Sequence, residues 1–368
     1  MIDINPCAEI NLTNYKNNLQ SIKSFIKKDV KIMAIVKANA YGHGAVEISK
    51  AANEIGIRHF GVATLEEGIE LRENNIIGEI LIFGQISPNE IGKARDFNLT
   101  LTLSDIRFLG YLKPDEKVKI HIKIDTGLSR NGFYMQHLEN VKNIYNLILN
   151  VKSIRNVELR GIYTHYASAE SNEAFTVKQL TLFNKLISML KTNAIDCGLI
   201  HTSNSAATLL YPETHFDMVR IGLLSYGINI TNIPINVHPV MRVKGTLIQE
   251  KNIKAGDKVG YGLTYTAKSD LIVGIVNLGY ADGISRQLSN KAYFTLNGTR
   301  VKCIGRISMD VLAIDITNCS YNLYDDVVIF GEPNNSEISV NQISKILKTI
   351  HYEVLCSIGN RVKRKIVY

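Results

Sequence analysis

Short β-rich runs alternate with longer helical patterns between about residue 30 and residue 220, and this alternation constrains the fold more than any other feature of the chain. Several runs are almost continuously apolar, as expected of strands that are covered on both faces. The eight runs span residues 31–36, 59–63, 80–83, 99–103, 118–124, 157–163, 199–202 and 216–221. Eight strand–helix units predict an α/β fold, a (β/α)8 TIM-like barrel.

One helix between these runs has an unusually clear pattern. Its apolar residues are spaced by three or four, so they should share one face: Val177, Leu180, Phe183, Leu186 and Leu190.

The sequence pattern changes after about residue 235, where short Val-, Ile-, Thr- and Tyr-rich runs are separated by Gly, Asn and Asp. We therefore expect a barrel in residues 1–235 and a mostly-β domain in residues 236–368. The second domain should contain strands at 243–250, 271–278, 292–296, 300–304, 312–316 and 327–330 and one helix at 340–348. Residues 8–12 are a further candidate strand of that domain.

Composition narrows the functional class. The net charge is +8, but the basic residues are scattered, apart from a tail at 361–365, so nucleic-acid binding is not expected. The five cysteines form no C-x-x-C pair, which argues against a disulfide framework and a zinc site, and we expect no metal. No apolar stretch approaches the ~20 residues of a membrane helix, so we expect a cytoplasmic chain. A transmembrane domain preceding residue 1, making this the cytoplasmic domain of an anchored protein, stays open.

The segment after the first barrel strand carries the strongest chemical signal. Residues 36–44 read V-K-A-N-A-Y-G-H-G, which places Lys37 at the carboxyl end of a buried strand, where barrels hold their catalytic groups. A partly desolvated lysine there can form a Schiff base, and the Tyr41 hydroxyl suits a phosphate oxygen. The alternative is a lysine that only extends to solvent.

This string resembles the pyridoxal 5'-phosphate (PLP) signature of the alanine racemases of fold type III, and the likeness extends over both domains. The resemblance implies a homodimer with shared active sites, in which Lys37 binds PLP and is one of two catalytic bases. PLP-dependent decarboxylases have a similar lysine segment, so the string alone identifies the cofactor and not the reaction.

Residues 124–132, I-D-T-G-L-S-R-N-G, follow the fifth strand and present a guanidinium suited to a carboxylate or phenolate. An ordinary exposed loop arginine is the alternative. The segment is similar to the racemase D-T-G-x-x-R-x-G motif, which implies that Arg130 contacts cofactor and substrate. Lys123 corresponds to a lysine that is N-carboxylated in some members.

The sixth and seventh strands end in further candidates. A histidine at a strand end is more often structural, but the resemblance implies that His165 stacks on the PLP ring and that Glu170 lies in the corridor leading to the site. Asn204 and Ser205 begin a helix after the seventh strand, where they are either ordinary caps or phosphate ligands. The resemblance favours the phosphate role.

The eighth strand contains Arg220, which matches the racemase arginine at the pyridine nitrogen. Because an arginine does not give up its proton to that nitrogen, the ring is a weaker electron sink than one paired with a carboxylate. The family also implies phosphate contacts from the backbone amides of Gly222 and Leu223.

Residues 259–267, V-G-Y-G-L-T-Y-T-A, read by themselves as a turn between strands. They resemble the racemase Y-G-x-T-Y-x-A segment, which implies that Tyr265 is the second base and acts on the PLP of the partner subunit. Racemisation needs a proton donor or acceptor on each face of the α-carbon. Matching segments place the Met309 amide at the substrate carboxylate and assign three residues to the corridor: Tyr280, Arg286 and Arg306.

One position departs from the family. The usual I-S-Y-R-V-P-R pattern is I-G-N-R-V-K-R here, so Asn360 replaces a tyrosine that packs beside the substrate methyl group. An amide offers the donor and acceptor that a serine side chain would use. This departure looks like the membrane-bound serine racemases of vancomycin-resistance clusters, and neutral drift with ordinary alanine preference is the alternative.

We therefore expect a PLP-dependent isomerase that racemises serine and alanine and supplies D-amino acids to peptidoglycan precursors, with an extension to vancomycin resistance. A PLP-dependent decarboxylase is a second class, but the Gly-rich triplet phosphate loop that it requires is not found. A non-catalytic PLP carrier would not need a second domain with Tyr265.

Overall fold

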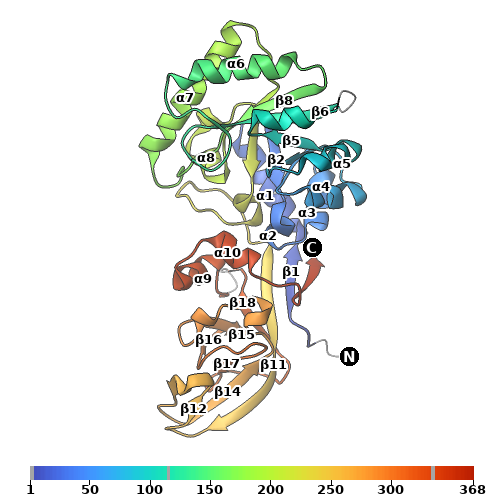
Figure 1. The fold of residues 1–368 in the computed structure, drawn as a ribbon. Coiled ribbons are helices and arrows are strands. Elements are labelled where there is room, and N and C mark those ends of the chain that lie inside the picture. Colours follow the sequence, from blue (N-terminus) through green and yellow to red (C-terminus); the bar gives the residue numbers. More distant parts are fainter. Residues whose placement is uncertain (1–3, 114–116, 333–335) are drawn as a thin grey trace. The chain divides into compact units, whose positions relative to one another are not determined.

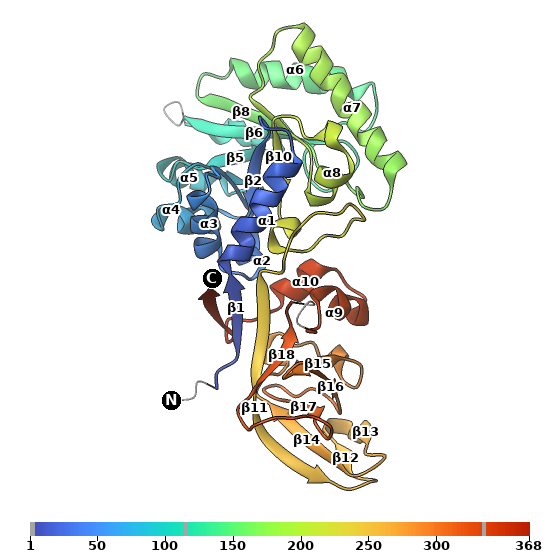
Figure 2. The same ribbon diagram turned by 180° about the vertical axis from the view of Figure 1, so that it is seen from behind.

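The computed structural model describes residues 4–113, 117–332 and 336–368. The described chain divides into two compact units (Figures 1 and 2). One unit contains residues 16–40 and 45–237. The other contains the residues up to Tyr15, the short segment Tyr41–Gly44 and His238–Tyr368.

The first unit is a parallel barrel of eight strands, with the order β10-β2-β3-β4-β5-β6-β8-β9. Across the remaining seam, the Asp217 amide donates to the Ile200 carbonyl (3.0 Å) and the Arg220 amide to the Ser203 carbonyl (3.0 Å). The strands are β2 (Lys31–Ile35), β3 (His59–Val62), β4 (Glu79–Ile82), β5 (Thr100–Leu103), β6 (Val118–Asp125), β8 (Val157–Tyr163), β9 (Leu199–His201) and β10 (Met218–Ile221). All eight predicted strands are confirmed, and so is the barrel.

Helices follow the strands around this unit (Figure 1). The α-helical segments are α1 (Leu12–Phe25), α2 (Lys37–Tyr41), α3 (Ala45–Glu54), α4 (Leu65–Glu73), α5 (Ile91–Asp96), α6 (Asn140–Ser153), α7 (Glu173–Thr192) and α8 (Ser205–Leu210). The short 3-10 turns are η1 (Pro88–Glu90), η2 (Ile106–Tyr111), η3 (Pro212–Thr214) and η4 (Leu223–Tyr226), and the two-residue strand β7 (Phe133–Tyr134) pairs with β6.

Helix α7 buries Leu180, Phe183, Leu186 and Leu190 as predicted, but Val177 is 42% exposed. At about 100° per residue, Val177 falls on the flank of the stripe that the other four residues define. The predicted common face was therefore one residue too long.

The second unit contains an antiparallel barrel of six strands, in the order β14-β17-β16-β15-β18-β11, which β14 closes by pairing again with β11. The 13-residue strand β11 (Met241–Ile253) can serve both ends because its register shifts twice along its length, as bulges allow. The other strands of the barrel are β14 (Leu271–Val276), β15 (Tyr293–Leu296), β16 (Thr299–Cys303), β17 (Leu312–Asp315) and β18 (Asp326–Phe330).

Two strands extend this sheet beyond β11. Strand β1 (Cys7–Asn11) pairs antiparallel with β11, and β19 (Lys363–Val367) pairs parallel with β1. Strand β19 falls in the segment that the sequence suggested was a basic tail. It is an edge strand, and lysines are common on such edges because they discourage pairing with other chains.

The same unit carries a small hairpin of β12 (Lys258–Val259) and β13 (Tyr265–Thr266), the turns η5 (Tyr261–Leu263), η6 (Tyr280–Asp282) and η7 (Arg286–Leu288), and two helices, α9 (Val340–Leu347) and α10 (His351–Cys356). Only α9 was expected. Over the described parts of the chain, no helix is both long enough and apolar enough to cross a membrane.

Candidate active site

The carboxyl ends of the parallel strands gather five candidates at one end of the first barrel. Lys37 follows β2, Arg130 follows β6, His165 follows β8, Ser205 follows β9, and Arg220 lies within β10. Strands far apart in sequence therefore bring these groups to the same end of the barrel.

Lys37 begins a turn with an uncommon backbone. Its side chain is half-buried, and the next three residues, Ala38, Asn39 and Ala40, have φ of 51°, 51° and 54° with similar ψ, so this stretch of α2 is a left-handed turn. The left-handed region costs L-residues roughly 1–2 kcal/mol each. Such strain concentrates at functional sites, where surrounding contacts maintain it.

Two side chains hold this turn. The Glu67 carboxylate accepts from the Ala38 amide (2.7 Å) and from the Ala63 amide (2.6 Å). The Asn39 side chain accepts from the Ala45 amide (2.7 Å) at the start of α3. The backbone that carries Lys37 is therefore tied to α4 and to the first residue of α3.

Arg220 is almost fully buried, and its guanidinium is directed by five acceptors. Its Nη1 donates to the Nδ1 and the carbonyl of His201 (both 3.0 Å). Its Nη2 donates to the Thr164 carbonyl (2.9 Å), the Thr202 carbonyl (2.8 Å) and Nδ1 of His165 (3.1 Å). Among the described residues, none accepts from its Nε–H.

His165 is neutral in this setting. Burial, followed by the charges of Arg220 and Arg130, holds the pKa of His165 well below its ordinary value. Because Nδ1 accepts from Arg220, the proton of the ring lies on Nε2.

Lys123 lies inside the barrel, on β6. Burial lowers the pKa of Lys123 to about 7, and the charges of Arg130, Arg220 and Lys37 act in the same direction. Its amine donates to the Asn131 side chain and lies 5.7 Å from the centre of the Tyr163 ring. Four cationic side chains therefore influence one another at this end of the barrel.

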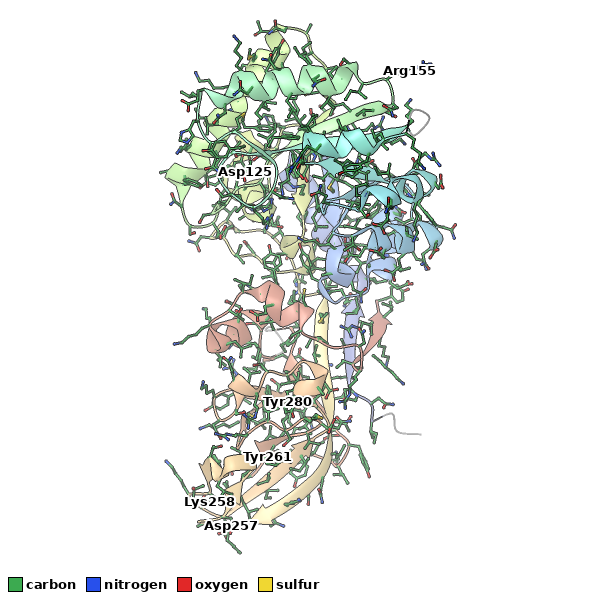
Figure 3. All side chains as sticks on the ribbon, in the orientation of Figure 1. Asp125, Arg155, Asp257, Lys258, Tyr261 and Tyr280 are labelled. Atoms are coloured by element: carbon green, nitrogen blue, oxygen red, sulfur yellow. The ribbon has the colours of Figure 1, made fainter. Side chains whose placement is uncertain are left out.

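Asp125, labelled in Figure 3, shapes the loop that carries Arg130. Its carboxylate accepts from the backbone amides of Gly127 (2.9 Å), Ser129 (3.1 Å) and Arg130 (3.1 Å). The Arg130 side chain is exposed. The loop itself is ordered by the aspartate of the D-T-G sequence.

Ser205 begins helix α8 and lies beside the chain that leaves β10. Its hydroxyl accepts from the amides of Gly222 (3.2 Å) and Leu224 (3.4 Å), whereas no described residue accepts from the Leu223 amide. Asn204 caps α8 by accepting from the Ala207 amide (2.9 Å). Its predicted contact with the cofactor stays a prediction.

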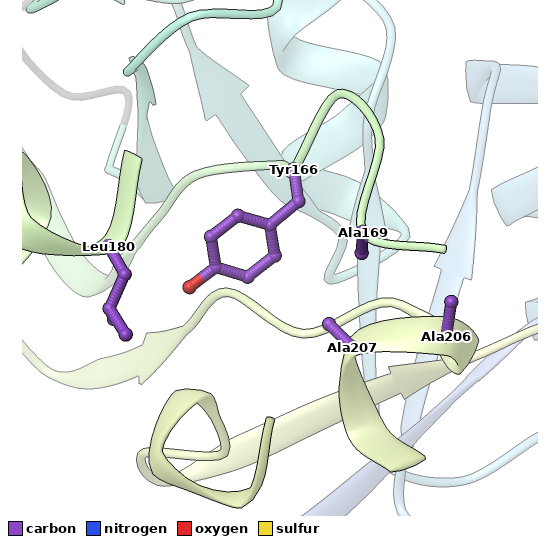
Figure 4. Packing of buried hydrophobic residues seen from close by; sticks show 5 residues of the cluster. All are labelled: Tyr166, Ala169, Leu180, Ala206 and Ala207. Carbon is purple, nitrogen blue, oxygen red and sulfur yellow. The ribbon is translucent and has the colours of Figure 1, made fainter. Parts of the chain in front are cut away.

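A small apolar cluster fixes α8 in place (Figure 4). Tyr166 and Leu180 pack with Ala169, Ala206 and Ala207. The Tyr166 hydroxyl donates to Thr202 (3.0 Å), which precedes the same helix. Glu170 follows this cluster on an exposed loop.

The other unit gathers the remaining candidates on adjoining loops, and Figure 3 labels two of their residues, Tyr261 and Tyr280. The Tyr280 amide donates to the Ser308 carbonyl (3.0 Å) and the Ala281 amide to the Met309 carbonyl (3.0 Å). Arg361, next to the exposed Asn360, pairs with Asp282 (3.2 Å) and Asp310 (2.8 Å).

The turn before Tyr265 packs against Arg306, because a Cβ at Gly262 would lie 2.6 Å from the Arg306 guanidinium. Tyr265 itself lies on β13 and is half-buried; burial and the charge of Asp315 raise the pKa of its phenol. Arg286 is exposed on the turn η7.

Tyr41 and the turn at Asn360 belong to the same unit. Tyr41 is buried, and its ring meets Tyr352 edge-on at 5.2 Å. Arg364 donates to the carbonyls of Gly42 (2.9 Å), Ile358 (2.6 Å) and Val362 (2.8 Å). One guanidinium thus joins the loop that contains Tyr41 to the turn that contains Asn360.

Sequence reasoning missed several residues that organise these sites: Glu67, Glu79, His121, Tyr163, His201 and Arg364. One signal was present in β6, where polar residues at every second position alternate with apolar ones and therefore share a face: Lys119, His121, Lys123 and Asp125. His121, Lys123 and Asp125 are all buried, and such buried polar groups on one face of a strand indicate a polar barrel interior.

Comparisons with known proteins agree with this arrangement. Residues 10–230 match the family described as alanine racemase, N-terminal domain, and residues 240–366 match alanine racemase, C-terminal domain. The alanine racemase of Methanococcus maripaludis is 38% identical over 97% of each chain, and that of Carboxydothermus hydrogenoformans is 37% identical over 97% of this chain and 98% of its own.

Solved structures are similar as well. The crystal structure of alanine racemase from D-cycloserine-producing Streptomyces lavendulae has a TM-score of 0.93 at 30% identity, covering 100% of this chain and 98% of that one. An alanine racemase of Clostridium difficile 630 has a TM-score of 0.91 at 32% identity, covering 100% and 97%. The chain therefore belongs to the alanine racemase family.

Proposed function

We propose that this chain interconverts L- and D-alanine. The family is PLP-dependent, and the relatives named above are alanine racemases, so the chain is an amino-acid racemase and PLP is its cofactor. The same relatives favour alanine over serine, which the sequence alone had suggested as the first substrate. The observation that carries the proposal is the geometry of Arg220.

The residues at the end of the barrel fit PLP. Arg220 keeps one donor, its Nε–H, for an acceptor such as a pyridine nitrogen, while its other hydrogens are directed to the protein. The Leu223 amide and the Ser205 hydroxyl are groups suited to a phosphate, and Lys37 would hold the aldehyde carbon covalently. Arg130, His165 and Tyr41 are proposed to complete the cofactor site, with Asn204 and the Gly222 amide.

When bound to the substrate nitrogen, PLP withdraws electrons from the α-carbon and so weakens its C–H bond. Arg220 would limit that withdrawal, because a guanidinium donates a hydrogen bond to the ring nitrogen without giving up its proton. Lys37 takes or returns the α-proton on one face of the substrate. A second base is needed on the opposite face.

We assign the second base to Tyr265 of a partner subunit, which makes the working enzyme a homodimer. Tyr265 lies on a short hairpin next to an exposed turn, and such a turn is accessible to another chain. The corridor by which substrate reaches the site is proposed to contain three residues of the β-rich unit and one of the barrel unit: Tyr280, Arg286 and Arg306, and Glu170. The Met309 amide and Arg130 would bind the substrate carboxylate.

Serine is a second candidate substrate, and Asn360 is the single observation in its favour. The side chain is exposed in this chain, and no described residue bonds to its amide, so the amide is available to a hydroxyl. A pocket rejects an isostere with an added hydroxyl only weakly, so activity on both amino acids is expected. The D-amino acids that the enzyme forms are proposed to supply peptidoglycan precursors. A role in vancomycin resistance would require a preference for serine.

The test follows deuterium from solvent. L-alanine incubated with the holoenzyme in D2O should yield D-alanine that carries deuterium at the α-carbon, and Lys37→Ala should abolish the exchange. Borohydride reduction followed by peptide mass mapping should place a pyridoxyl group on Lys37. Release of carbon dioxide without α-deuterated D-alanine would instead indicate a decarboxylase and end the proposal.

A further inference from the structure

A line of buried polar side chains crosses the interior of the first barrel, from Arg220 to Glu79. Arg220 Nη1 lies 3.0 Å from His201 Nδ1, and His201 Nε2 lies 2.8 Å from His121 Nδ1. His121 Nε2 lies 3.2 Å from the Glu79 carboxylate. Both histidines are at most 1% exposed. Arg220 lies near the carboxyl end of β10, whereas Glu79 is the first residue of β4, so the line joins opposite ends of the barrel.

The chemistry of the two ends fixes the direction of every hydrogen bond. A guanidinium can only donate, so His201 Nδ1 carries no proton, and burial with the charge of Arg220 holds the pKa of His201 well below its ordinary value. Neutral His201 therefore carries its proton on Nε2 and donates to Nδ1 of His121. His121 in turn carries its proton on Nε2 and donates to Glu79.

Glu79 is held as an acceptor by groups on three other strands. Thr100 donates to its carboxylate (3.1 Å), Arg160 pairs with it at 3.7 Å, and the His59 ring lies at 4.0 Å. Burial by itself raises the pKa of Glu79, but the hydrogen bond from His121 and the charge of Arg160 act in the opposite direction and keep the pKa below its ordinary value. An ionised carboxylate has no proton to donate.

The ring of Tyr163 covers one face of the His201 imidazole. It stacks on His201 with centroids 4.8 Å apart and an interplanar angle of 8°, and the Arg220 guanidinium lies 5.4 Å from its centre. Rotation of the imidazole is thereby restricted, so the proton positions depend on the partners at its two nitrogens.

We propose that Glu79 is a positioning residue for the racemase site: its carboxylate selects the Nε2–H tautomers of His121 and His201, and these hold the Arg220 guanidinium in its observed orientation. Without an acceptor at position 79, His121 is free to carry its proton on Nδ1. His201 would then present Nδ1–H to the guanidinium, and two donors would face each other. The proposal rests on the proposed function only for the consequence at PLP.

The test reads the tautomers directly. Imidazole 15N resonances of [15N]histidine-labelled enzyme, with and without PLP, distinguish protonated from unprotonated nitrogens, and His121→Asn and His201→Asn assign the signals. We expect Nε2–H on both histidines in wild-type enzyme and mixed tautomers in Glu79→Ala. Retained tautomers are expected in Glu79→Gln, whose amide oxygen can still accept. Glu158→Ala is the matched control, because Glu158 also pairs with Arg160 (2.9 Å) but does not contact His121.

In the holoenzyme, Glu79→Ala should lower kcat about tenfold and leave KM for alanine within twofold, since an outer residue acts through Arg220 and not on the substrate. A proton on His201 Nδ1 in the wild-type enzyme would overturn the proposal. So would a Glu79→Ala variant whose histidine tautomers and kcat equal those of the wild-type enzyme. If that variant does not fold, loss of the single tautomers in Glu79→Gln overturns it and their retention supports it. The spectra of the PLP-free protein keep this outcome separate from failure of the racemase proposal.

Discussion

The depressed pKa of Lys123 leads to a prediction about its covalent state. Carbon dioxide reacts only with a neutral amine, giving a carbamate and releasing one proton. With a pKa of about 7, Lys123 is about 90% neutral at pH 8, whereas an amine at the ordinary value of 10.5 is roughly 0.3% neutral. The reactive form is thus enriched about 300-fold. The product anion would lie among the cations that lower the pKa of the amine, namely Arg130, Arg220 and Lys37.

We therefore expect Lys123 to be N-carboxylated in bicarbonate buffer. The 13C NMR spectrum of the enzyme in [13C]bicarbonate should contain a carbamate resonance of up to one group per chain. At constant dissolved carbon dioxide, the signal should rise between pH 6 and pH 8, because the neutral fraction of Lys123 rises from about 10% to about 90%.

Lys123→Met should remove the resonance. Lys119→Met is the matched control, since Lys119 lies on the same strand but donates to Asn98 (2.7 Å) outside this cluster of cations. The same carbamate signal in wild-type enzyme and in Lys123→Met would refute the reasoning.

Three further predictions concern other parts of the proposed site. Tyr265→Phe should lower racemisation at least 100-fold while Lys37 still takes up the pyridoxyl label, and a wild-type rate in that variant would exclude Tyr265 as a base. Asn360→Tyr should raise the ratio of kcat/KM for alanine to that for serine about tenfold, and an unchanged ratio would end the specificity role. Glu67→Ala should destabilise the fold by roughly 1–3 kcal/mol in denaturant unfolding, because two amides lose their acceptor; a value equal to that of the exposed neighbour Glu66→Ala would contradict this.

The barrel could be predicted from the sequence because several of its strands are short apolar runs, as expected of strands covered on both faces, and all eight alternate with helical patterns. The edge strand β19 could not, since its alternating lysines resemble a solvated tail until β1 is known to lie beside it. Helix α10 was missed because it has only six residues. Its two buried apolar side chains are too few to show a helical periodicity in the sequence.

The residues of the candidate site also divide into those that the sequence predicts and those that it does not. Lys37, Arg130 and Arg220 follow or end predicted strands, so topology alone brings them to one end of the barrel. The partners of Arg220 could not be found so simply. His121 and His201 are 80 residues apart, and Glu79 lies at the amino end of its strand, whereas the catalytic groups of such barrels lie at the carboxyl ends. Their connection depends on side-chain directions that spacing does not reveal.

The left-handed turn after Lys37 also bears on how its amine can move. The hydrogen bonds between Ala38 and Glu67 and between Asn39 and Ala45 hold this backbone in the left-handed region, so it does not relax to the right-handed or extended region while they are intact. The backbone at Lys37 is then fixed, and its amine moves only by rotation about its own side-chain torsions. Such torsions relax in picoseconds to nanoseconds, whereas collective rearrangements of the backbone take microseconds or longer. Rotation of the side chain can therefore redirect a proton on this lysine without a collective motion of the barrel backbone.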